Sequence, residues 1–345
     1  MLLGANVDRN GGIRHHLLGI QRYSSLKVEL APPDAMLSAL SYHDLRTTVR
    51  QAFLDFDPRG ITVIHSHVYP YYVEWCHAKR GSGPLWIHTY HAPYLPEYSV
   101  GELAPWQKEI NDVLINVACN ADVRISVSRW QQRYLEEKHG IRTTYVPNGV
   151  DVALCDQGDA GRFTGSTGAE GFVLWVGRND PVKNPGDFVR LAERLPDLRF
   201  VMVGGGLGKD QLKRAWNVTA PANLSFTGEM PRTEVQNALA ACSALVLTSR
   251  REGLPTLVLE GLAHGKPVIV PNDPGCVEAL GSERFGGIYA HGDVEDMADR
   301  LRAALAATDP ARALGARNRV LAEYDWRVVA TRLDAIYDGS SARRA

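Results

Sequence analysis

The sequence predicts an α/β protein of two successive units, each built around a doubly wound parallel sheet. Short apolar runs alternate with helical segments along the chain, which is the pattern of strands joined by crossover helices. This rhythm restarts after a polar segment at residues 157–171, and 345 residues correspond to two domains at ~100–200 residues per domain. Because open sheets of this kind bind ligands at the carboxyl ends of their strands, we expect the active site in the cleft between the two units.

The elements of the first unit follow from this alternation. Pro105 suits a first helical turn, and Ser128 is expected to cap a helix that Gly140 ends. The expected strands are Leu2–Val7, Ile61–Ser66, Leu85–Thr89, Val123–Val127 and Thr143–Val146, and the expected helices are Ile13–Arg22, Tyr71–Lys79, Ala104–Ala118 and Trp130–Lys138.

The second unit begins with Phe172–Val176, a nearly continuous apolar run of the kind that a sheet covered on both faces buries. The further expected strands are Phe200–Val203, Leu224–Phe226, Ala244–Thr248 and Val268–Val270, and the expected helices are Asp187–Arg194, Lys209–Trp216, Thr233–Ala241, Thr256–Ala263, Val294–Ala307 and Trp326–Tyr337. The second unit therefore repeats the architecture of the first.

Charge and composition exclude several classes of protein. The chain has 38 basic and 39 acidic side chains, so it lacks the basic footprint of a nucleic-acid-binding domain. With 45% hydrophobic and 22% charged residues, it is not a highly charged disordered chain. The five cysteines form no Cys-x-x-Cys pair, which fits a reducing cytoplasm better than a disulfide framework or a zinc site.

The first residues do not have the pattern of a signal peptide, because polar side chains at residues 8–10 interrupt the first apolar run. No stretch approaches the ~18 uninterrupted apolar residues of a membrane span. We therefore expect a cytoplasmic enzyme, with weak peripheral contact on the inner face of the membrane left open.

The segment from Arg250 to Pro267 carries the strongest functional signal. Pro255 follows a predicted strand and opens a helix, so the next backbone N–H groups lack intrahelical acceptors and form an anion site suited to a diphosphate. Glu252 precedes this terminus, and Glu260 lies roughly 7.5 Å along the axis from Pro255 at ~1.5 Å per residue. A ligand with its phosphates on the helix tip would present sugar hydroxyls to Glu252 and ribose hydroxyls to Glu260. The alternative is an ordinary capped helix with two unrelated glutamates. The three N–H groups belong to Thr256, Leu257 and Val258.

Two basic residues, Arg178 and Lys183, follow the first strand of the second unit. Fixed cations at the carboxyl end of a strand would neutralise a departing diphosphate, although a solvated loop with unrelated basic residues is the alternative. After the next strand, Gly204 and Gly205 begin a glycine-rich run. It is similar to a dinucleotide fingerprint, but Lys209 occupies the place of the third glycine, so we expect close backbone approach to a nucleotide rather than NAD binding.

Together these motifs resemble the retaining glycosyltransferases of family four, whose pattern is Glu-x7-Glu. The resemblance covers nearly the whole chain and implies the GT-B fold, with two facing Rossmann-like domains and a cleft between them. It implies an acceptor-side domain over 1–150, a nucleotide-sugar-binding domain over 151–322, and a C-terminal helix over 323–345 that crosses back toward the first domain. Three more stretches carry it: Gly11-Gly12, Val146-Pro-Asn148-Gly149-Val-Asp151 and Tyr324-Asp325-Trp326.

The resemblance also implies the role of each site residue. Arg178 and Lys183 would bind the donor diphosphate, Glu252 the transferred sugar and Glu260 the ribose. His91 would be the active-site histidine, with His88 as the alternative match. The donor would also contact Gly11, Gly12, Gly204, Gly205, Thr256, Leu257 and Val258.

The resulting hypothesis is a retaining, metal-independent transfer of a sugar from a nucleoside-diphosphate sugar to a hydroxyl acceptor. We expect a UDP-linked donor in preference to a GDP-linked one, and an acceptor that is a glycan, a lipid-linked glycan or a small molecule. No cofactor, metal or nucleic acid is expected. Two alternatives are a nucleotide-sugar epimerase of the same fold and a non-catalytic protein that binds a nucleotide sugar.

Two other patterns invite a metal site but are assigned otherwise. His15-His16 and His65-x-His67 have no carboxylate cluster beside them, so we expect them at the rim of the first domain or at strand ends. Asp55-Phe-Asp57 falls in a predicted turn, and we expect it to be solvated.

Overall fold

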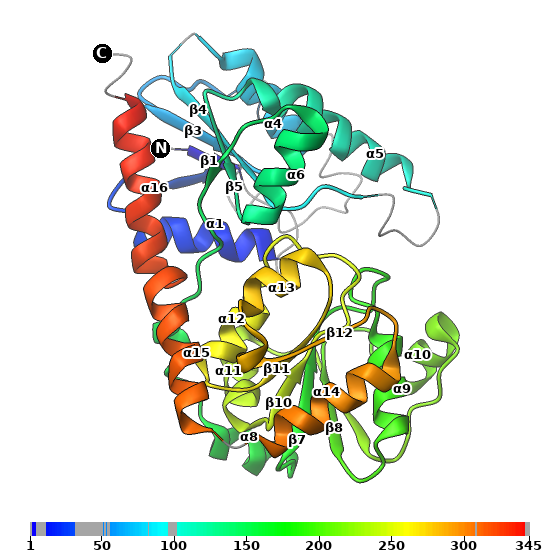
Figure 1. Cartoon of the computed structure of the whole chain (residues 1–345). Coiled ribbons are helices and arrows are strands. Elements are labelled where there is room, and N and C mark those ends of the chain that lie inside the picture. The colour runs from blue at the N-terminus through cyan, green and yellow to red at the C-terminus, as the bar shows by residue number, and fades with distance from the viewer. Residues whose placement is uncertain are drawn as a thin grey trace. The chain divides into compact units, whose positions relative to one another are not determined.

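The computed structural model of the chain describes residues 2–4, 12–31, 51, 53, 56–81, 83–95, 102–307 and 309–341. The described residues form two compact α/β units, each with a six-stranded parallel sheet (Figure 1). The N-terminal unit contains the described chain up to Gly149 together with the last helix, and the C-terminal unit contains Val150–Asp325. The predicted α/β class, with two units of parallel sheet, is confirmed.

The sheet of the N-terminal unit has the strand order β2-β1-β3-β4-β5-β6, and all neighbouring strands are parallel. Its strands are β1 (Leu2–Gly4), β2 (Glu29–Ala31), β3 (Val63–Ser66), β4 (Leu85–Tyr90), β5 (Val123–Ser126) and β6 (Thr144–Tyr145). Its helices are α1 (Gly12–Tyr23), α4 (Pro70–Lys79), α5 (Pro105–Asp112), α6 (Arg129–His139) and α16 (Trp326–Ser341), with a π-helical turn at Val113–Val117 and a 3-10 turn at Ala118–Asn120.

Successive side chains of β3 and β4 alternate between two cores, one on each face of this sheet. Val63 and Leu85 pack with apolar residues of α1 and α16, whereas Ile64 and Trp86 pack with residues of α4 and of the segment that follows α5. Every residue of β3 and β4 is buried. Successive side chains of a strand point to opposite faces, so strands in which every residue is buried belong to a sheet that is covered on both faces.

Helix α16 packs through Trp326 against two glycines, Gly19 of α1 and Gly149, and no larger residue fits at either position. A Cβ on Gly19 would lie 2.1 Å from the indole ring, and a Cβ on Gly149 would lie 2.3 Å from it. Gly149 belongs to the segment Val146–Asp151 that the sequence singled out. One function of that motif is therefore to let the last helix approach the N-terminal unit closely.

The sheet of the C-terminal unit has the order β12-β11-β10-β7-β8-β9, again with all neighbours parallel. Its strands are β7 (Phe172–Val176), β8 (Arg199–Val203), β9 (Leu224–Gly228), β10 (Ala244–Val246), β11 (Val268–Pro271) and β12 (Gly286–Tyr289). Its helices are α7 (Val152–Cys155), α8 (Ala160–Thr167), α9 (Pro185–Arg194), α10 (Lys209–Trp216), α11 (Arg232–Ala241), α12 (Thr256–Ala263), α13 (Pro274–Leu280), α14 (Val294–Ala306) and α15 (Pro310–Glu323), with a 3-10 turn at Glu283–Phe285.

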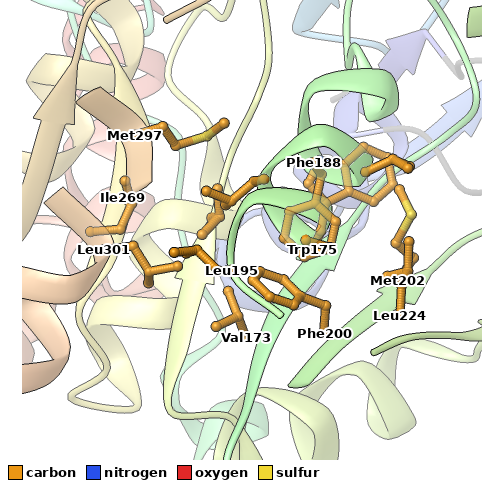
Figure 2. Packing of buried hydrophobic residues seen from close by; sticks show 14 of the residues in the cluster. Val173, Trp175, Phe188, Leu195, Phe200, Met202, Leu224, Ile269, Met297 and Leu301 are labelled. Atoms are coloured by element: carbon orange, nitrogen blue, oxygen red, sulfur yellow. The ribbon is translucent and has the colours of Figure 1, made fainter. Parts of the chain in front are cut away.

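A large apolar core joins this sheet to α9 and α14 (Figure 2). Trp175 of β7 and Phe200 of β8 pack with Phe188 of α9, and the rings of Phe188 and Phe200 meet edge to face at 5.4 Å. Met297 and Leu301 of α14 are fully buried in the same cluster. Truncating one such aromatic ring to alanine costs about 3–5 kcal/mol, so this core fixes the strands whose carboxyl ends carry the candidate site.

Some predicted elements differ from those observed. Gly140 ends α6 in the left-handed conformation, as expected, with φ of 65°. Ser128 occupies the N-cap position of α6, but its buried hydroxyl makes no hydrogen bond, so the predicted side-chain cap is wrong. The strand predicted to reach Thr248 ends at Val246. Strands β2 and β12 and helices α7, α8, α13 and α15 were not predicted.

All five cysteines are free thiols, and all but Cys119 are buried. Burial raises the pKa of Cys242 to about 12, so this thiol stays protonated at neutral pH. Within the described part of the chain, no helix is both long and apolar enough to cross a membrane.

Candidate functional site

The candidate site residues of the C-terminal unit lie on loops that follow three adjacent strands. Arg178 and Lys183 follow β7, Gly204 follows β8 and Glu252 follows β10. These strands are neighbours in one parallel sheet, so their carboxyl ends share one edge. The fold therefore brings together three segments that lie far apart in the sequence.

Lys183 and Glu252 form an ion pair at this edge. The Nζ of Lys183 lies 2.6 Å from Oε1 of Glu252, and the two side chains are 29% and 14% exposed. Burial alone lowers the pKa of Lys183, but the carboxylates of Glu252 and Asp180 outweigh burial and raise it, so the lysine stays charged at neutral pH. A charge-assisted bond of this kind holds the ammonium in a fixed position.

Hydrogen bonds to the backbone hold the loop that carries Lys183. Its backbone N–H donates to Oδ1 of Asp180 at 2.9 Å, and its carbonyl accepts from Oγ1 of Thr248 at 2.8 Å. The N–H of Arg250 donates to the carbonyl of Val182 at 2.7 Å. The loop after β7 is thus joined to the segment after β10 through the carbonyl groups of Val182 and Lys183.

Arg178 lies on the same loop in a more open position. Its side chain is 64% exposed, and its Nε donates to Oδ2 of Asp180 at 3.0 Å. The positive charge of Arg178 opposes the protonation of Lys183, which indicates that the two cations are near one another. An exposed cation beside a partly buried one suits an anion that enters from solvent.

The helix predicted to open after Pro255 is α12, and its N-cap residue provides no side-chain cap. Pro255 occupies the N-cap position and makes no side-chain hydrogen bond to the helix. The helix starts at Thr256, and its first-turn N–H groups belong to Thr256, Leu257 and Val258. These groups and the positive end of the helix dipole favour an anion.

Sequence reasoning missed Asp273, which lies near Glu252. It is the N-cap of α13 and accepts a hydrogen bond from the N–H of Cys276 at 3.0 Å. Burial, with repulsion from Glu252 in addition, raises the pKa of Asp273 to about 6. The signal was present in the sequence, since Asp followed by Pro at positions 273–274 is typical of a helix start.

Glu260 belongs to a second polar network, made with α11. Its Oε1 accepts from Nη2 of Arg232 at 2.9 Å, and its Oε2 accepts from Nε2 of Gln236 at 2.7 Å. Oε1 of Gln236 lies 2.9 Å from Nε2 of His264. Each carboxylate oxygen has a further lone pair, so Glu260 retains the capacity to accept another hydrogen bond.

Of the two predicted glycines after β8, Gly204 has a packing reason of its own. Gly204 has φ of 152°, and a Cβ there would lie 1.8 Å from the carbonyl oxygen of Gly177. A Cβ on Gly205 would make only an ordinary van der Waals contact, at 3.4 Å from Oε2 of Glu229. The loop after β8 therefore packs directly on the loop that carries Arg178.

In the N-terminal unit, His91 follows β4 and His88 lies inside it. His88 is fully buried, with Nδ1 2.8 Å from Oγ of Ser66 and Nε2 without a hydrogen-bond partner. His91 is buried at the end of the strand, with Nε2 2.9 Å from Nδ1 of His67. Burial lowers the pKa of His91 well below its usual value, so the ring is neutral at pH 7.

The remaining predicted positions have mixed outcomes. Gly12 begins α1 and is exposed, whereas Gly11 and Asp55 lie outside the described residues. Asp57 is in an exposed turn and pairs with Arg59, as expected. His65 lies in β3 and His67 directly follows it, as the strand-end alternative predicted. These two residues and His16 of α1 are buried, so they do not lie at an exposed rim. Two aromatic rings of α16 contact them: the ring centroid of Trp326 lies 5.2 Å from that of His16, and the ring centroid of Tyr337 lies 5.8 Å from that of His65.

Two family descriptions match the chain, one in each half. Residues 19–154 match glycosyltransferase family 4, and residues 160–320 match glycosyl transferases group 1. The first match covers much of the N-terminal unit and the second covers most of the C-terminal unit.

Curated relatives are glycosyltransferases and synthases of larger size. The chain is 29% identical to a sulfoquinovosyl transferase of Arabidopsis thaliana over 165 residues, which is 47% of the chain and 32% of that protein. It is 28% identical to a glycogen synthase of Mycobacterium tuberculosis over 263 residues, which is 73% of the chain and 62% of that protein. The chain thus spans less than two thirds of the length of either relative.

Solved structures share the architecture of the whole chain. The sucrose-phosphate synthase of Thermosynechococcus elongatus superposes with a TM-score of 0.80 at 19% identity, covering 99% of both chains. HepE of Anabaena in complex with UDP-glucose has a TM-score of 0.73 at 17% identity, covering 98% of this chain and 99% of HepE. The chain therefore has the GT-B fold, with a domain of the glycosyltransferase family 4 type at residues 19–154 and one of the glycosyl transferases group 1 type at residues 160–320.

Proposed function

We propose that the protein is a retaining glycosyltransferase of family four, which transfers a sugar from a UDP-linked donor to a hydroxyl acceptor without a metal ion. The observation that carries the proposal is the Lys183–Glu252 pair on the loops that precede α9 and α12. The group 1 glycosyltransferase match over the same unit supports it, as does the presence of UDP-glucose in the HepE structure.

In this proposal the charge of the donor diphosphate is met by protein groups alone. Lys183, Arg178 and the N–H groups at the start of α12 stabilise the negative charge that grows on the leaving group. Glu252 accepts a hydrogen bond from a hydroxyl of the transferred sugar, and Glu260 accepts one from the ribose. Because Lys183 is already held by Glu252, little side-chain entropy is lost when the donor binds.

The reaction is proposed to proceed on one face of the sugar. The acceptor oxygen forms a bond to the anomeric carbon while the bond from that carbon to the diphosphate oxygen breaks. The acceptor proton passes to the departing phosphate oxygen. Because the new bond forms on the face from which the diphosphate departs, the configuration at the anomeric carbon is retained. His91 takes the role of the active-site histidine that the family resemblance implies.

The acceptor and the cellular location are proposals of the same kind. We expect a glycan, a lipid-linked glycan or a small molecule as acceptor. The free thiols support a cytoplasmic enzyme, and weak peripheral membrane contact stays a prediction.

A thermal-shift screen against UDP- and GDP-linked hexoses, followed by mass spectrometry of products formed in a cell extract, tests the proposal. A UDP-hexose is expected to raise the melting temperature and to yield a product with an added hexose in the presence of EDTA. The anomeric proton coupling, read by NMR, is expected to be the same in donor and product. An epimerised sugar still attached to the nucleotide, or binding with no product, would support one of the two alternative functions instead.

A further inference from the structure

One amide side chain joins two loops of the candidate site to each other. Asn179 directly follows Arg178 on the loop after β7, and its Nδ2 donates to the carbonyl of Gly206, in the loop after β8, at 2.8 Å. Its Oδ1 accepts from Nε1 of Trp216, the last residue of α10, at 2.7 Å. An indole N–H only donates and a backbone carbonyl only accepts, so one orientation of the amide satisfies both partners.

Trp216 is itself fixed on its other side by α9, the helix that follows Lys183. A Cβ on Gly186, in the first turn of α9, would lie 3.1 Å from the Trp216 side chain, so the two are closely packed. The carbonyl of Trp216 also accepts from Nη2 of Arg190 at 3.4 Å. Asn179 is therefore bonded to a residue that the neighbouring helix holds in place.

The loop after β8, residues 204–208, has the sequence Gly-Gly-Gly-Leu-Gly. Glycine loses more conformational freedom on ordering than any other residue, so a loop with this composition needs anchors to keep one conformation. The N–H of Gly204 donates to the carbonyl of Gly228 at 2.9 Å, and Leu207 is buried in the apolar core. The bond from Asn179 holds the middle of the loop, at Gly206, which has φ of 69°.

We propose that Asn179 is a positioning residue for donor binding, which holds residues 204–208 against the loop that carries Arg178. This role rests on the proposed function, in which Arg178 meets the diphosphate and the backbone after β8 approaches the nucleotide.

The groups of the chemical step have other supports. Lys183 is held by Glu252 and by backbone hydrogen bonds, and Arg178 is held by Asp180. Loss of the Asn179 amide leaves all of these contacts in place. Asn179 therefore acts on the binding of the donor and not on the transfer step.

Steady-state kinetics of Asn179→Ala, with Asn223→Ala as the matched control, test this role. Asn223 also donates from its amide to backbone carbonyls, but it precedes β9 and so lies at the opposite edge of the same sheet. We expect Asn179→Ala to raise Kd for UDP, and KM for the UDP-hexose that the wild type transfers, about tenfold, the cost of one or two hydrogen bonds. The value of kcat should stay within about threefold of the wild type, the pattern of lost uniform binding.

Asn223→Ala should lower the melting temperature and leave Kd and KM unchanged, because its amide supports the fold and not the site. Two results for Asn179→Ala would overturn its positioning role. One is a KM within about twofold of the wild type, and the other is a fall in kcat that exceeds the rise in KM.

Trp216→Phe tests the same contact with a smaller change, since it keeps a ring beside Gly186 and removes only the N–H donor. We expect it to raise KM about threefold. The double variant with Asn179→Ala should be no worse than Asn179→Ala alone, because both changes break one shared contact. Effects that multiply in the double variant would contradict the proposal.

Indole N–H resonances of the protein labelled with ¹⁵N at its seven tryptophans test the contact without any substrate. Trp216→Phe identifies the resonance of Trp216, which Asn179→Ala is expected to shift and Asn223→Ala is not. An unshifted resonance in Asn179→Ala overturns the proposal. A wild type that neither binds UDP nor transfers a sugar overturns the proposed function, and this role with it. A wild type that binds UDP, with the same Kd in Asn179→Ala, overturns the role of Asn179 alone.

Discussion

The ammonium of Lys183 and the carboxylate of Glu252 lie 2.6 Å apart although 69 positions separate them in the chain. They meet because β7 and β10, which precede them, pair side by side in the parallel sheet. Each side chain is held in place by the other at the sheet edge where open α/β folds bind their ligands. The proposed function depends on this pair more than on any other contact.

Arg178→Ala is expected to lower the transfer rate by about 100-fold to 1,000-fold, the usual cost of removing one preorganised group that stabilises transition-state charge. Because the Arg178 side chain is largely exposed, the free energy of unfolding should change by less than about 0.5 kcal/mol. Rate assays and chemical denaturation measure the two effects. Arg302→Ala removes an exposed arginine that pairs with Asp197 in the same unit, and it should leave the rate unchanged. Near-normal turnover in Arg178→Ala would sink the role given to this residue.

Arg232→Met is expected to weaken donor binding rather than the chemical step. It removes the guanidinium that holds Oε1 of Glu260, so the carboxylate loses its fixed direction toward the proposed ribose. We expect KM for the donor to rise about tenfold with kcat nearly unchanged, the pattern of lost uniform binding. Arg162→Met, which breaks an exposed pair with Glu234, is the control. An unchanged KM in Arg232→Met would argue against a ribose contact by Glu260.

Asp273→Asn is expected to stabilise the fold at neutral pH more than at low pH. The pKa of Asp273 is raised in the folded state to about 6, so the stabilisation by its bound proton is present below about pH 4 and is lost as pH rises through 6. At 1.36 kcal/mol per pKa unit, the charged carboxylate costs about 3 kcal/mol above pH 6. Denaturation at pH 4 and pH 7.5 should therefore show a relative gain for the variant of about 2–3 kcal/mol at the higher pH. An equal effect at both values would mean that Asp273 titrates normally.

Gly19→Ala should destabilise the protein although alanine favours helices. The new methyl group would lie 2.1 Å from the ring of Trp326, and such overpacking costs about 1–3 kcal/mol. Gly339→Ala, on α16 with open space around it, is the matched control. It should raise the free energy of unfolding by no more than about 1 kcal/mol. Thermal denaturation compares the two, and equal melting temperatures would show that α1 and α16 separate readily.

The sequence was sufficient to predict the parts of the site that local rules govern. Pro255 opened the predicted helix at Thr256, where the structure begins α12. The apolar run at 172–176 gave β7, and with it the loop that carries Lys183. Each of these depends on neighbours in the chain, either through a restricted proline torsion angle or through a continuous buried strand.

Features that depend on distant pairing could not be predicted in this way. No spacing relates His16, His67 and His91, because three separate segments bring them together. Glu260 was predicted as a ribose ligand, but its contacts with α11 required knowledge of helix packing. Strand β12 was missed because it begins with two glycines, which are unfavourable in strands.

The most direct test of the central claim is the acceptor-dependent release of nucleoside diphosphate by the wild type and by Lys183→Met. We predict that the variant, assayed with the same donor and acceptor, releases the diphosphate at least about 100-fold more slowly. Lys213→Met, on the exposed face of α10, should match the wild type. A rate for Lys183→Met within about twofold of the wild type would contradict the proposal that this ammonium stabilises the leaving diphosphate.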